Sequence, residues 1–216
     1  MTKANPLTIE GLTVGFHGKA IFQDVSLDIL QNEFVTLMGE NGAGKTVLLE
    51  AMMGYVNPTK GRVSFWGSRF RGKSLRELNS RIGWVLSHRE DYPIGLNVGR
   101  FLDLHAACRR SWDSKFVEEL LTRFQLDASK KLTALSLGEQ SKVKLVKALA
   151  FKPEFLVLDE LTANLSPDSK QTILDTLIEQ FSTGSMSVLY VSHSNDEALR
   201  LSDRVLQLTP NGLVSR

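Results

Sequence analysis

The sequence predicts an α/β fold with a mostly parallel sheet, an antiparallel β region near the N-terminus and an inserted helical subdomain. From Glu139 onward, helix-like and strand-like segments alternate, which is typical of a parallel sheet with helices on both faces. Residues 7–38 instead contain short apolar or alternating runs broken by Gly, Asn and His, which indicates strands and hairpins. Between Asn97 and Leu132, apolar residues recur at helical spacing, which predicts the insert.

The first part of the chain is expected to be rich in strands. The runs LTIEGLTV, FQDVSLDI and EFVTLM favour strands, and the segment from Gly44 to Met53 favours a helix. RVSFWG predicts a further strand. A charged segment, which we expect to be helical, precedes another strand from Ile82 to Leu86.

The second part is expected to alternate helices and strands. In the insert, Asp113 is placed to cap a helix whose apolar positions are Phe116, Val117, Leu120, Leu121 and Phe124. We then expect helices at 139–151, 167–181 and 195–201, and strands at 155–158, 187–191 and 204–208. No internal repeat or low-complexity linker is visible, so we expect residues 1–216 to form one domain with a helical subdomain at about 88–152.

Composition predicts a folded protein without a direct nucleic-acid partner. The 216 residues are 42% hydrophobic, enough for a substantial core. The 26 basic and 24 acidic residues give a net charge of +2, which is too even to attract nucleic acid by bulk electrostatics. The basic clusters RFRGK and Arg109-Arg110 are interpreted as solvated faces. The single cysteine, Cys108, excludes an internal disulfide, fits a reducing compartment, and is expected to be a small core residue rather than a nucleophile.

The chain is not expected to cross a membrane by itself. Its start, MTKANPLTIEG, lacks the apolar core of a secretory signal, and no stretch approaches the ~18 apolar residues of a membrane span. Association with membrane subunits that are separate chains remains compatible with this composition.

A glycine-rich phosphate loop is the first chemical motif. The strand-like FVTLM leads into GENGAGKT, which matches G-x-x-x-x-G-K-[ST] in the required strand, loop and helix context; the alternative is a chance glycine turn. Glycines let backbone N–H groups converge on phosphates, Lys45 reaches the β- and γ-phosphates, and Thr46 can bind Mg²⁺. The residues expected to contact ATP here are Gly39, Glu40, Asn41, Gly42, Ala43, Gly44, Lys45, Thr46 and Val47.

FLVLDE supplies the acidic half of an NTPase centre. Four apolar residues bury the strand and deliver Asp159 and Glu160 at its carboxyl end, where ligands bind in open α/β sheets. Asp159 is expected to hold Mg²⁺, directly or through water. Glu160 is expected to orient or deprotonate the attacking water, a role typically worth ~10²–10⁴ in rate.

YVSHS adds a histidine at the end of the last strand but one. His193 is expected at the same sheet edge, where an imidazole can hydrogen-bond a γ-phosphate oxygen or the water. A lone histidine after a strand is more often structural, but its position beside the other two motifs favours a catalytic role.

Four motifs in this order resemble the nucleotide-binding subunit of an ATP-binding cassette (ABC) transporter. They are GENGAGKT, LSLGEQ before a helix, FLVLDE, and SH about a strand and a helix later. The resemblance covers essentially the whole chain, and LSLGE followed by a helix and FLVLDE is its most specific part. It implies a P-loop NTPase that binds ATP and Mg²⁺ and hydrolyses ATP to ADP and phosphate.

The resemblance also assigns roles residue by residue. Phe16 matches the aromatic that stacks on adenine, and His193 matches the switch histidine. Ser87 and His88 fall in the loop that senses the γ-phosphate and faces the membrane partner. The signature residues, which meet the ATP held by the P-loop of a second subunit, are Ser136, Leu137, Gly138 and Glu139. The resemblance therefore implies a head-to-tail dimer with itself or a homologous cassette.

Several positions depart from the family pattern. Ser87 stands where glutamine is usual and is too short to span the same distance to Mg²⁺, so that His88 or a bridging water is left to substitute. The other departures are Leu137 for glycine, Glu139 for glutamine, Leu161 for proline and Ser166 for aspartate. Because the P-loop and acidic residues are retained, we interpret the departures as tuning of an active ATPase.

The resemblance implies a subunit that powers separate integral membrane transport subunits and lies in the cytoplasm at the inner face of the cell membrane. The alternative within the family is a soluble ABC-type ATPase, but those acting on DNA carry long coiled-coil inserts and those acting on ribosomes carry two cassettes per chain. A small-metabolite kinase would leave LSLGEQ unexplained, and a pure binding module would leave Asp159 and Glu160 unexplained. The short chain is similar in layout to cassettes of small exporter systems, which is an analogy only.

Overall fold

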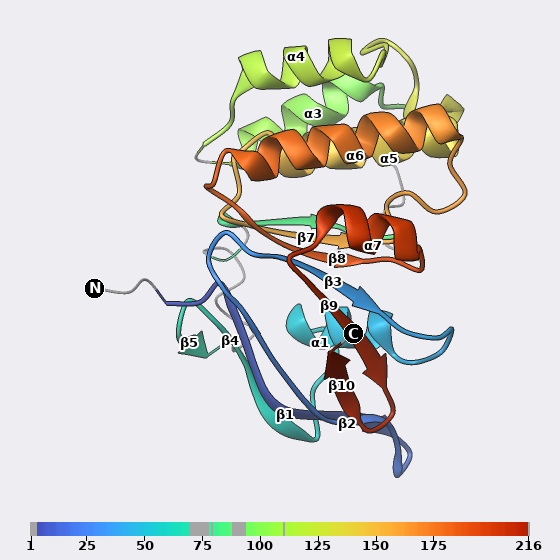
Figure 1. The fold of residues 1–216 in the computed structure, drawn as a ribbon. Helices are drawn as coiled ribbons and strands as arrows, with labels where there is room; N and C mark the ends of the chain where they lie inside the picture. Colours follow the sequence, from blue (N-terminus) through green and yellow to red (C-terminus); the bar gives the residue numbers. More distant parts are fainter. Residues whose placement is uncertain (1–3, 70–77, 79, 88–93, 110, 216) are drawn as a thin grey trace.

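The computed structural model describes residues 4–69, 78, 80–87, 94–109 and 111–215. Two sheets and a layer of helices make up this part of the chain (Figure 1). The strand order is β2-β1-β4-β5 in the first sheet and β10-β9-β3-β8-β7-β6 in the second. The expected α/β class is confirmed.

The first sheet is antiparallel, as the hairpin-like N-terminal pattern predicts. β1 (Leu7–Phe16) pairs with β2 (Lys19–Ile29) on one side and with β4 (Lys60–Phe65) on the other, and β5 (Ser68–Arg69) extends β4. Most of the charged segment expected to be helical before residue 82 lies outside the described residues.

The second sheet is parallel except at one edge. Its parallel strands are β6 (Ile82–Val85), β7 (Phe155–Asp159), β8 (Ser187–Val191), β3 (Phe34–Met38) and β9 (Arg204–Thr209). β10 (Gly212–Ser215) pairs antiparallel with β9 and was not among the expected elements.

The helices divide between the two faces of the parallel sheet. In Figure 1, α3 (Val98–Ala107), α4 (Ser114–Arg123), α5 (Leu137–Leu149) and α6 (Pro167–Ser182) lie above β7 and β8, whereas α1 (Lys45–Met52) lies below them, toward β1 and β2. The short helix α7 (Asn195–Leu201) follows β8, and a 3₁₀ turn, η2 (Leu132–Ala134), precedes α5. Among the described helices, none combines the length and hydropathy that a membrane crossing requires.

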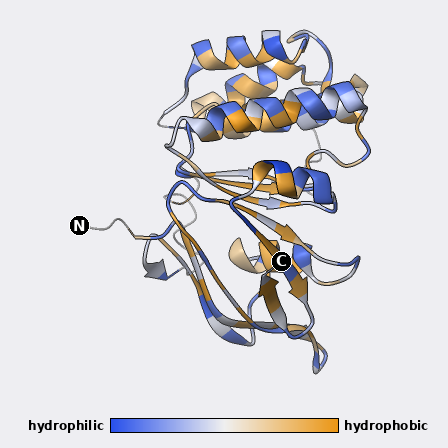
Figure 2. Cartoon of the chain, in the orientation of Figure 1, coloured by the Kyte–Doolittle hydropathy of each residue, from blue (hydrophilic) through white to orange (hydrophobic). Residues whose placement is uncertain are grey.

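Four of the parallel strands, β3, β6, β7 and β8, contribute side chains to two separate cores. Because successive side chains of a strand point to opposite faces, Phe34 packs on the helical layer, against Phe181 of α6, while Val35 and Leu37 pack toward α1 and the antiparallel sheet. Leu158 and Val157 divide in the same way. Figure 2 shows hydrophobic residues along the strands and polar residues on the outer helical surfaces. Burial of both faces holds the carboxyl ends of these strands in fixed register.

The expectation for Cys108 is wrong, because its side chain is exposed. Cys108 caps the carboxyl end of α3, beyond the turns in which Val98, Phe101 and Leu102 face the core. A residue that ends a helix in this way leaves the buried stripe.

Candidate nucleotide-binding site

The phosphate loop connects β3 to α1, as its sequence predicts. Gly44 precedes α1 with φ of 95°, a left-handed conformation that favours glycine. A β-carbon at Gly44 would lie 2.6 Å from Ile21 Cγ2 and 3.0 Å from Phe22 Cδ1, so the loop packs directly on β2. Gly42 is also left-handed, with φ of 81°. The loop therefore needs glycine for both its conformation and its close approach to the hairpin.

Lys45 is the first residue of α1, and its side chain contacts the phosphate loop. Its Nζ donates hydrogen bonds to the carbonyl oxygens of Gly39, at 2.9 Å, and Glu40, at 3.0 Å. Burial lowers the pKa of Lys45, and the carboxylates of Glu160 and Asp159 oppose that effect. The ammonium group thus stands between the loop carbonyls and the acidic end of β7.

Asp159 ends β7, and only 4% of the residue is exposed. Ser87 Oγ donates a hydrogen bond to Asp159 Oδ2 at 2.6 Å. The register of β6 and β7 explains the contact, because Val85 pairs with Leu158 and the two chains leave the sheet side by side. Ser87, expected to be too short to reach Mg²⁺ itself, instead reaches the carboxylate expected to bind Mg²⁺. His88 lies outside the described residues.

Lys144 is a residue of this region that the sequence reasoning missed. It belongs to α5, and its Nζ donates to the carbonyl oxygen of Leu86 at 3.2 Å. Burial lowers the pKa of Lys144, while Asp159 favours its charged form. A lysine between the buried Val143 and Leu145 is the sequence signal that could have drawn attention to it.

Glu160 and His193 form a pair across the ends of β7 and β8. His193 Nε2 lies 2.6 Å from Glu160 Oε1, and both side chains are partly exposed. The backbone N–H of Glu160 donates to the Val191 carbonyl at 3.0 Å. Glu160 has φ of 47°, an uncommon conformation for a non-glycine residue that often marks functional positions. The expectation that these two side chains share one sheet edge agrees with this geometry.

A buried carboxylate anchors the backbone on both sides of this pair, and sequence reasoning did not find it. Glu197 accepts hydrogen bonds from Tyr190 Oη and Ser192 Oγ, both at 2.6 Å, and from Thr162 Oγ1 at 2.7 Å. Lys170 Nζ lies 2.6 Å from Glu197 Oε1. Although burial raises the pKa of Glu197, these contacts outweigh it and lower the pKa overall. The network ties Thr162, just after Glu160, to Ser192, just before His193.

The signature turn, defined as Ser136, Leu137, Gly138 and Glu139, begins α5. Ser136 Oγ accepts from the Glu139 backbone N–H at 3.2 Å, and Glu139 Oε2 accepts from the Ser136 N–H at 2.8 Å, which completes a capping box. Gly138 lets this turn approach α6, because a β-carbon there would lie 3.1 Å from Ser169 Oγ. Leu137 is 62% exposed and so presents an apolar side chain on the outer surface.

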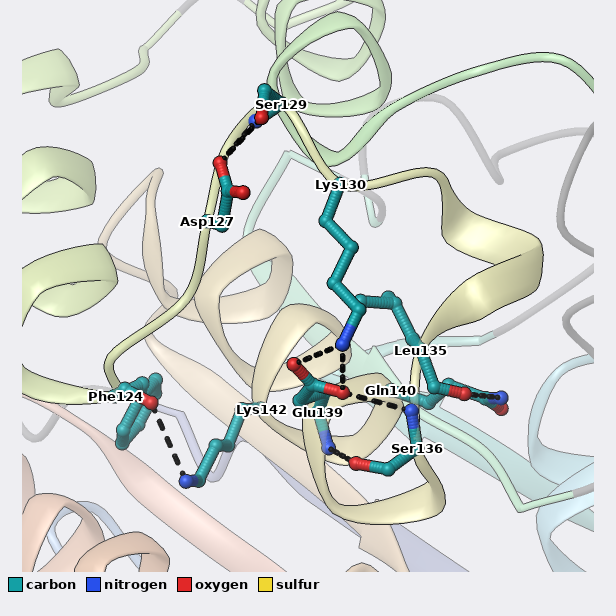
Figure 3. Close-up of polar contacts among 9 residues, drawn as sticks. All are labelled: Phe124, Asp127, Ser129, Lys130, Leu135, Ser136, Glu139, Gln140 and Lys142. Carbon is teal, nitrogen blue, oxygen red and sulfur yellow. Dashed lines mark hydrogen bonds and ion pairs between the residues drawn. The ribbon is translucent and has the colours of Figure 1, made fainter.

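Lys130 reaches the signature turn from the loop before η2 (Figure 3). Its Nζ donates to both carboxylate oxygens of Glu139, at 2.8 and 2.9 Å. Hydrogen bonds from Lys130 and from the Ser136 backbone lower the pKa of Glu139. The charge of the acid that replaces the usual glutamine is therefore neutralised within the same subunit.

Phe16 ends β1 and is 50% exposed. It pairs with Lys19 at the tip of the β1–β2 hairpin, whose second strand packs on Gly44. An exposed ring on a hairpin adjoining the phosphate loop is compatible with the base-stacking role predicted for it.

The structure brings most of the predicted residues to one edge of the parallel sheet. The phosphate loop, the pair Asp159 and Glu160, and His193 follow β3, β7 and β8, which are neighbours in the order β3-β8-β7. For Ser136, by contrast, the hydrogen bonds that the structure shows are those that cap α5. Roles for all these residues remain predictions.

Comparison with known proteins gives a family match over much of the chain. Residues 22–163 match the model of the ABC transporter family. The phosphonates import ATP-binding protein PhnC of Bradyrhizobium diazoefficiens is 30% identical over 223 residues, covering 96% of this chain and 83% of that protein. The energy-coupling factor transporter ATP-binding protein EcfA2 of Symbiobacterium thermophilum is 36% identical over 201 residues, covering 88% and 68% respectively.

The chain spans only part of one further relative and shares its fold with solved ATP-binding subunits. The Fe(3+) ions import ATP-binding protein FbpC of Streptomyces avermitilis is 33% identical over 205 residues, which cover 93% of this chain but 59% of that protein. A solved ATP-binding subunit of an ABC transporter superposes with a TM-score of 0.87 at 23% identity, covering 97% of this chain and 89% of that one. A dimeric ATP-binding cassette bound to ADP and phosphate superposes with a TM-score of 0.84 at 23% identity, covering 97% of both chains. At these identities the superpositions show the shared fold.

Proposed function

The chain belongs to the ABC transporter family, and from that premise we propose that it binds and hydrolyses ATP, dimerises on ATP and powers separate membrane subunits. The observation that carries the proposal is the pair Glu160 and His193, 2.6 Å apart at the sheet edge that also bears the phosphate loop. A carboxylate oriented by an imidazole beside a phosphate site suits activation of a water for attack on a phosphoryl group.

The chain's own residues perform most steps of this reaction. Backbone N–H groups of the phosphate loop and Lys45 hold the β- and γ-phosphates, because the loop and the start of α1 present positive potential. Glu160 accepts a proton from the attacking water, and His193 fixes the carboxylate that does so. Phe16 supports the adenine from the hairpin.

The residues present fit Mg²⁺ as the metal cofactor. Within the described part of the chain, no group of three His, Cys, Asp or Glu side chains could hold a metal ion. Mg²⁺ commonly takes only one or two carboxylates and completes its shell with substrate phosphates and waters. Asp159 and Thr46 would supply the protein oxygens, and the bound ion would neutralise charge on the phosphates.

The signature turn is proposed to act on the nucleotide of a second subunit. Ser136 and Leu137 are exposed at the start of α5, and the turn is already capped within its own chain. A head-to-tail dimer would bring it to the other subunit's γ-phosphate, consistent with the dimeric arrangement of a solved cassette of the same fold. One chain then forms half of each of two sites.

The proposed partners are separate integral membrane subunits, with the chain held in the cytoplasm at the inner face of the membrane. The relatives named above are import and energy-coupling ATP-binding proteins, which supports a transport role. The similarity in layout to small exporter cassettes stays a prediction. Copurification with membrane subunits would separate this role from that of a soluble ABC-type ATPase.

The proposed chemistry is tested by Glu160→Gln. Because the amide cannot accept the proton from water, turnover should fall by at least ~10²-fold while ATP binding is retained. Mg²⁺-dependent phosphate release and fluorescent-nucleotide binding measure the two effects. Unchanged turnover would remove Glu160 from the role of base, and absence of Mg²⁺-dependent hydrolysis by the unaltered protein, alone and with membrane partners, would overturn the proposed function.

A further inference from the structure

A negative charge lies at the turn that is proposed to receive the partner's γ-phosphate. Glu139 Oε2 accepts a hydrogen bond from the Ser136 backbone at 2.8 Å, so the carboxylate is one hydrogen bond from the residue that would meet the phosphate. Without a counter-ion, the carboxylate of Glu139 would repel the phosphates of ATP, because like charges that lie close together in a partly desolvated interface interact strongly.

Lys130 neutralises the charge of Glu139 by contacting both of its carboxylate oxygens. The two N–O distances are 2.8 and 2.9 Å, and the side chains of Lys130 and Glu139 are 35% and 24% exposed. As Figure 3 shows, Lys130 contacts the Glu139 carboxylate from the side opposite the Ser136 hydroxyl. The Ser136 hydroxyl is therefore not part of the ion pair.

The backbone around Lys130 is itself fixed in place. The Lys130 N–H donates to the Asp127 carbonyl at 3.1 Å, and the Lys130 carbonyl accepts from Val98 at 3.1 Å. Asp127 Oδ1 also accepts from Ser129 N and Oγ, at 2.8 and 2.7 Å. These bonds connect the loop to the start of α3, so the lysine is held near the signature turn by the insert and not only by its partner carboxylate.

We propose that Lys130 is a positioning residue for the nucleotide of the partner subunit, acting as the counter-ion that lets the Glu139 form of the signature turn accept a γ-phosphate. The inference rests on the proposed role of the signature turn between subunits. It adds that the acid at Glu139 and the lysine at Lys130 work as a unit, so the requirement for Lys130 exists only while Glu139 is an acid.

A double-mutant cycle in the Glu160→Gln background tests this dependence. That background separates ATP-driven dimerisation from turnover, and sedimentation with ATP and Mg²⁺ gives the protein concentration at half-dimerisation. Lys130→Met should raise this concentration roughly tenfold or more, since it leaves the Glu139 carboxylate without its counter-ion at the turn proposed to meet the phosphate. Lys130→Arg should restore dimerisation, because the guanidinium retains the ion pair.

The second arm of the cycle removes the acid. Glu139→Gln keeps an acceptor for the Ser136 N–H, since the capping box accepts glutamine as well as glutamate. With that change in place, Lys130→Met should alter half-dimerisation by less than about twofold, as expected for a coupling confined to one contacting pair. Lys131→Met is the matched control, because Lys131 is the next residue and its side chain is exposed; it should have little effect in either background.

The readouts distinguish positioning from folding. Fluorescent-nucleotide binding to the monomer should be unchanged by Lys130→Met, because the lysine acts on the other subunit's nucleotide. Equal weakening of dimerisation in the Glu139 and Glu139→Gln backgrounds, or no weakening in either, would overturn the inference alone. A parent protein that does not dimerise on ATP would overturn the proposed signature role and this inference with it.

Discussion

Glu160 and Asp159 are adjacent in sequence but differ in backbone and surroundings. Asp159 is buried at the end of β7 and hydrogen-bonded by Ser87, whereas Glu160 turns into the left-handed region and meets His193. Successive residues that leave a strand through such a turn can point to different parts of one site. The motif alone predicts both acids, but only the fold shows which partner each one takes.

Ser87 tests the residue-scale part of the account. Ser87→Ala removes the hydroxyl donor to Asp159, and loss of a hydrogen bond to a charged group costs about 1.5–3 kcal/mol, so we expect a roughly tenfold or greater rise in the Mg²⁺ concentration needed for hydrolysis. Ser87→Thr, which retains the hydroxyl, should stay near the unaltered protein. Metal titrations of phosphate release measure both variants. Identical titrations for the alanine variant and the unaltered protein would show that this hydrogen bond does not orient the carboxylate that is proposed to bind Mg²⁺.

Some contacts of the candidate site could not be predicted because their partners are far apart in the chain. Ser87 and Asp159 are separated by 72 residues, and Lys144 and Leu86 by 58. Periodicity and short motifs describe neighbours in sequence, whereas these contacts arise from the order of strands in the sheet. The same reason hides Glu197, which accepts hydrogen bonds from two loops and from β8 and forms an ion pair with a lysine of α6.

At the scale of elements, most helices and strands follow from local pattern. α6 begins at Pro167 after the capping Ser166, and the expected bounds 187–191 and 195–201 match β8 and α7. β10 was missed because it is a short edge strand of four residues. The Asn211-Gly212 pair, whose glycine is the first residue of β10, is a hairpin signal that could have identified it. Ser166, which replaces an aspartate of the family pattern, thus has a structural task as a helix cap.

The start of α5 should make stability depend on pH through Glu139. The folded-state pKa of Glu139 is lowered from 4.5, chiefly by Lys130 and then by the Ser136 backbone. A carboxyl group with a lowered folded pKa contributes stability that is fully present above its unfolded pKa and is lost as the pH falls through the folded value. Over a pH range from neutral to well below 4.5, denaturant unfolding should therefore show that the unaltered protein keeps its stability advantage over Glu139→Gln down to about 4.5 and loses it at lower pH. A difference between the two proteins that stays constant across this range would contradict the ion pair.

At the scale of the whole molecule, the described chain places its phosphate loop and its signature turn on different layers. The loop joins β3 to α1 on the side of the antiparallel sheet, while the turn begins α5 in the helical layer (Figure 1). Both motifs can be identified in the sequence, but the sequence does not show which subunit's nucleotide the signature turn meets. Only the assembled dimer can show this. The central claim of the proposed function is that the turn meets the nucleotide held by the second subunit.

Mixing two inactive variants tests this claim most directly. Ser136→Phe should block the signature turn and Lys45→Ala the phosphate loop, so each protein alone should lack hydrolysis. In a mixed dimer, one site combines the intact loop of the first chain with the intact turn of the second. Random pairing of equal amounts should then return roughly a quarter of the intact sites, measured as phosphate release by the mixture. Recovery to about that level is the result the account predicts, and a mixture no more active than either parent, with both variants folded, would contradict it.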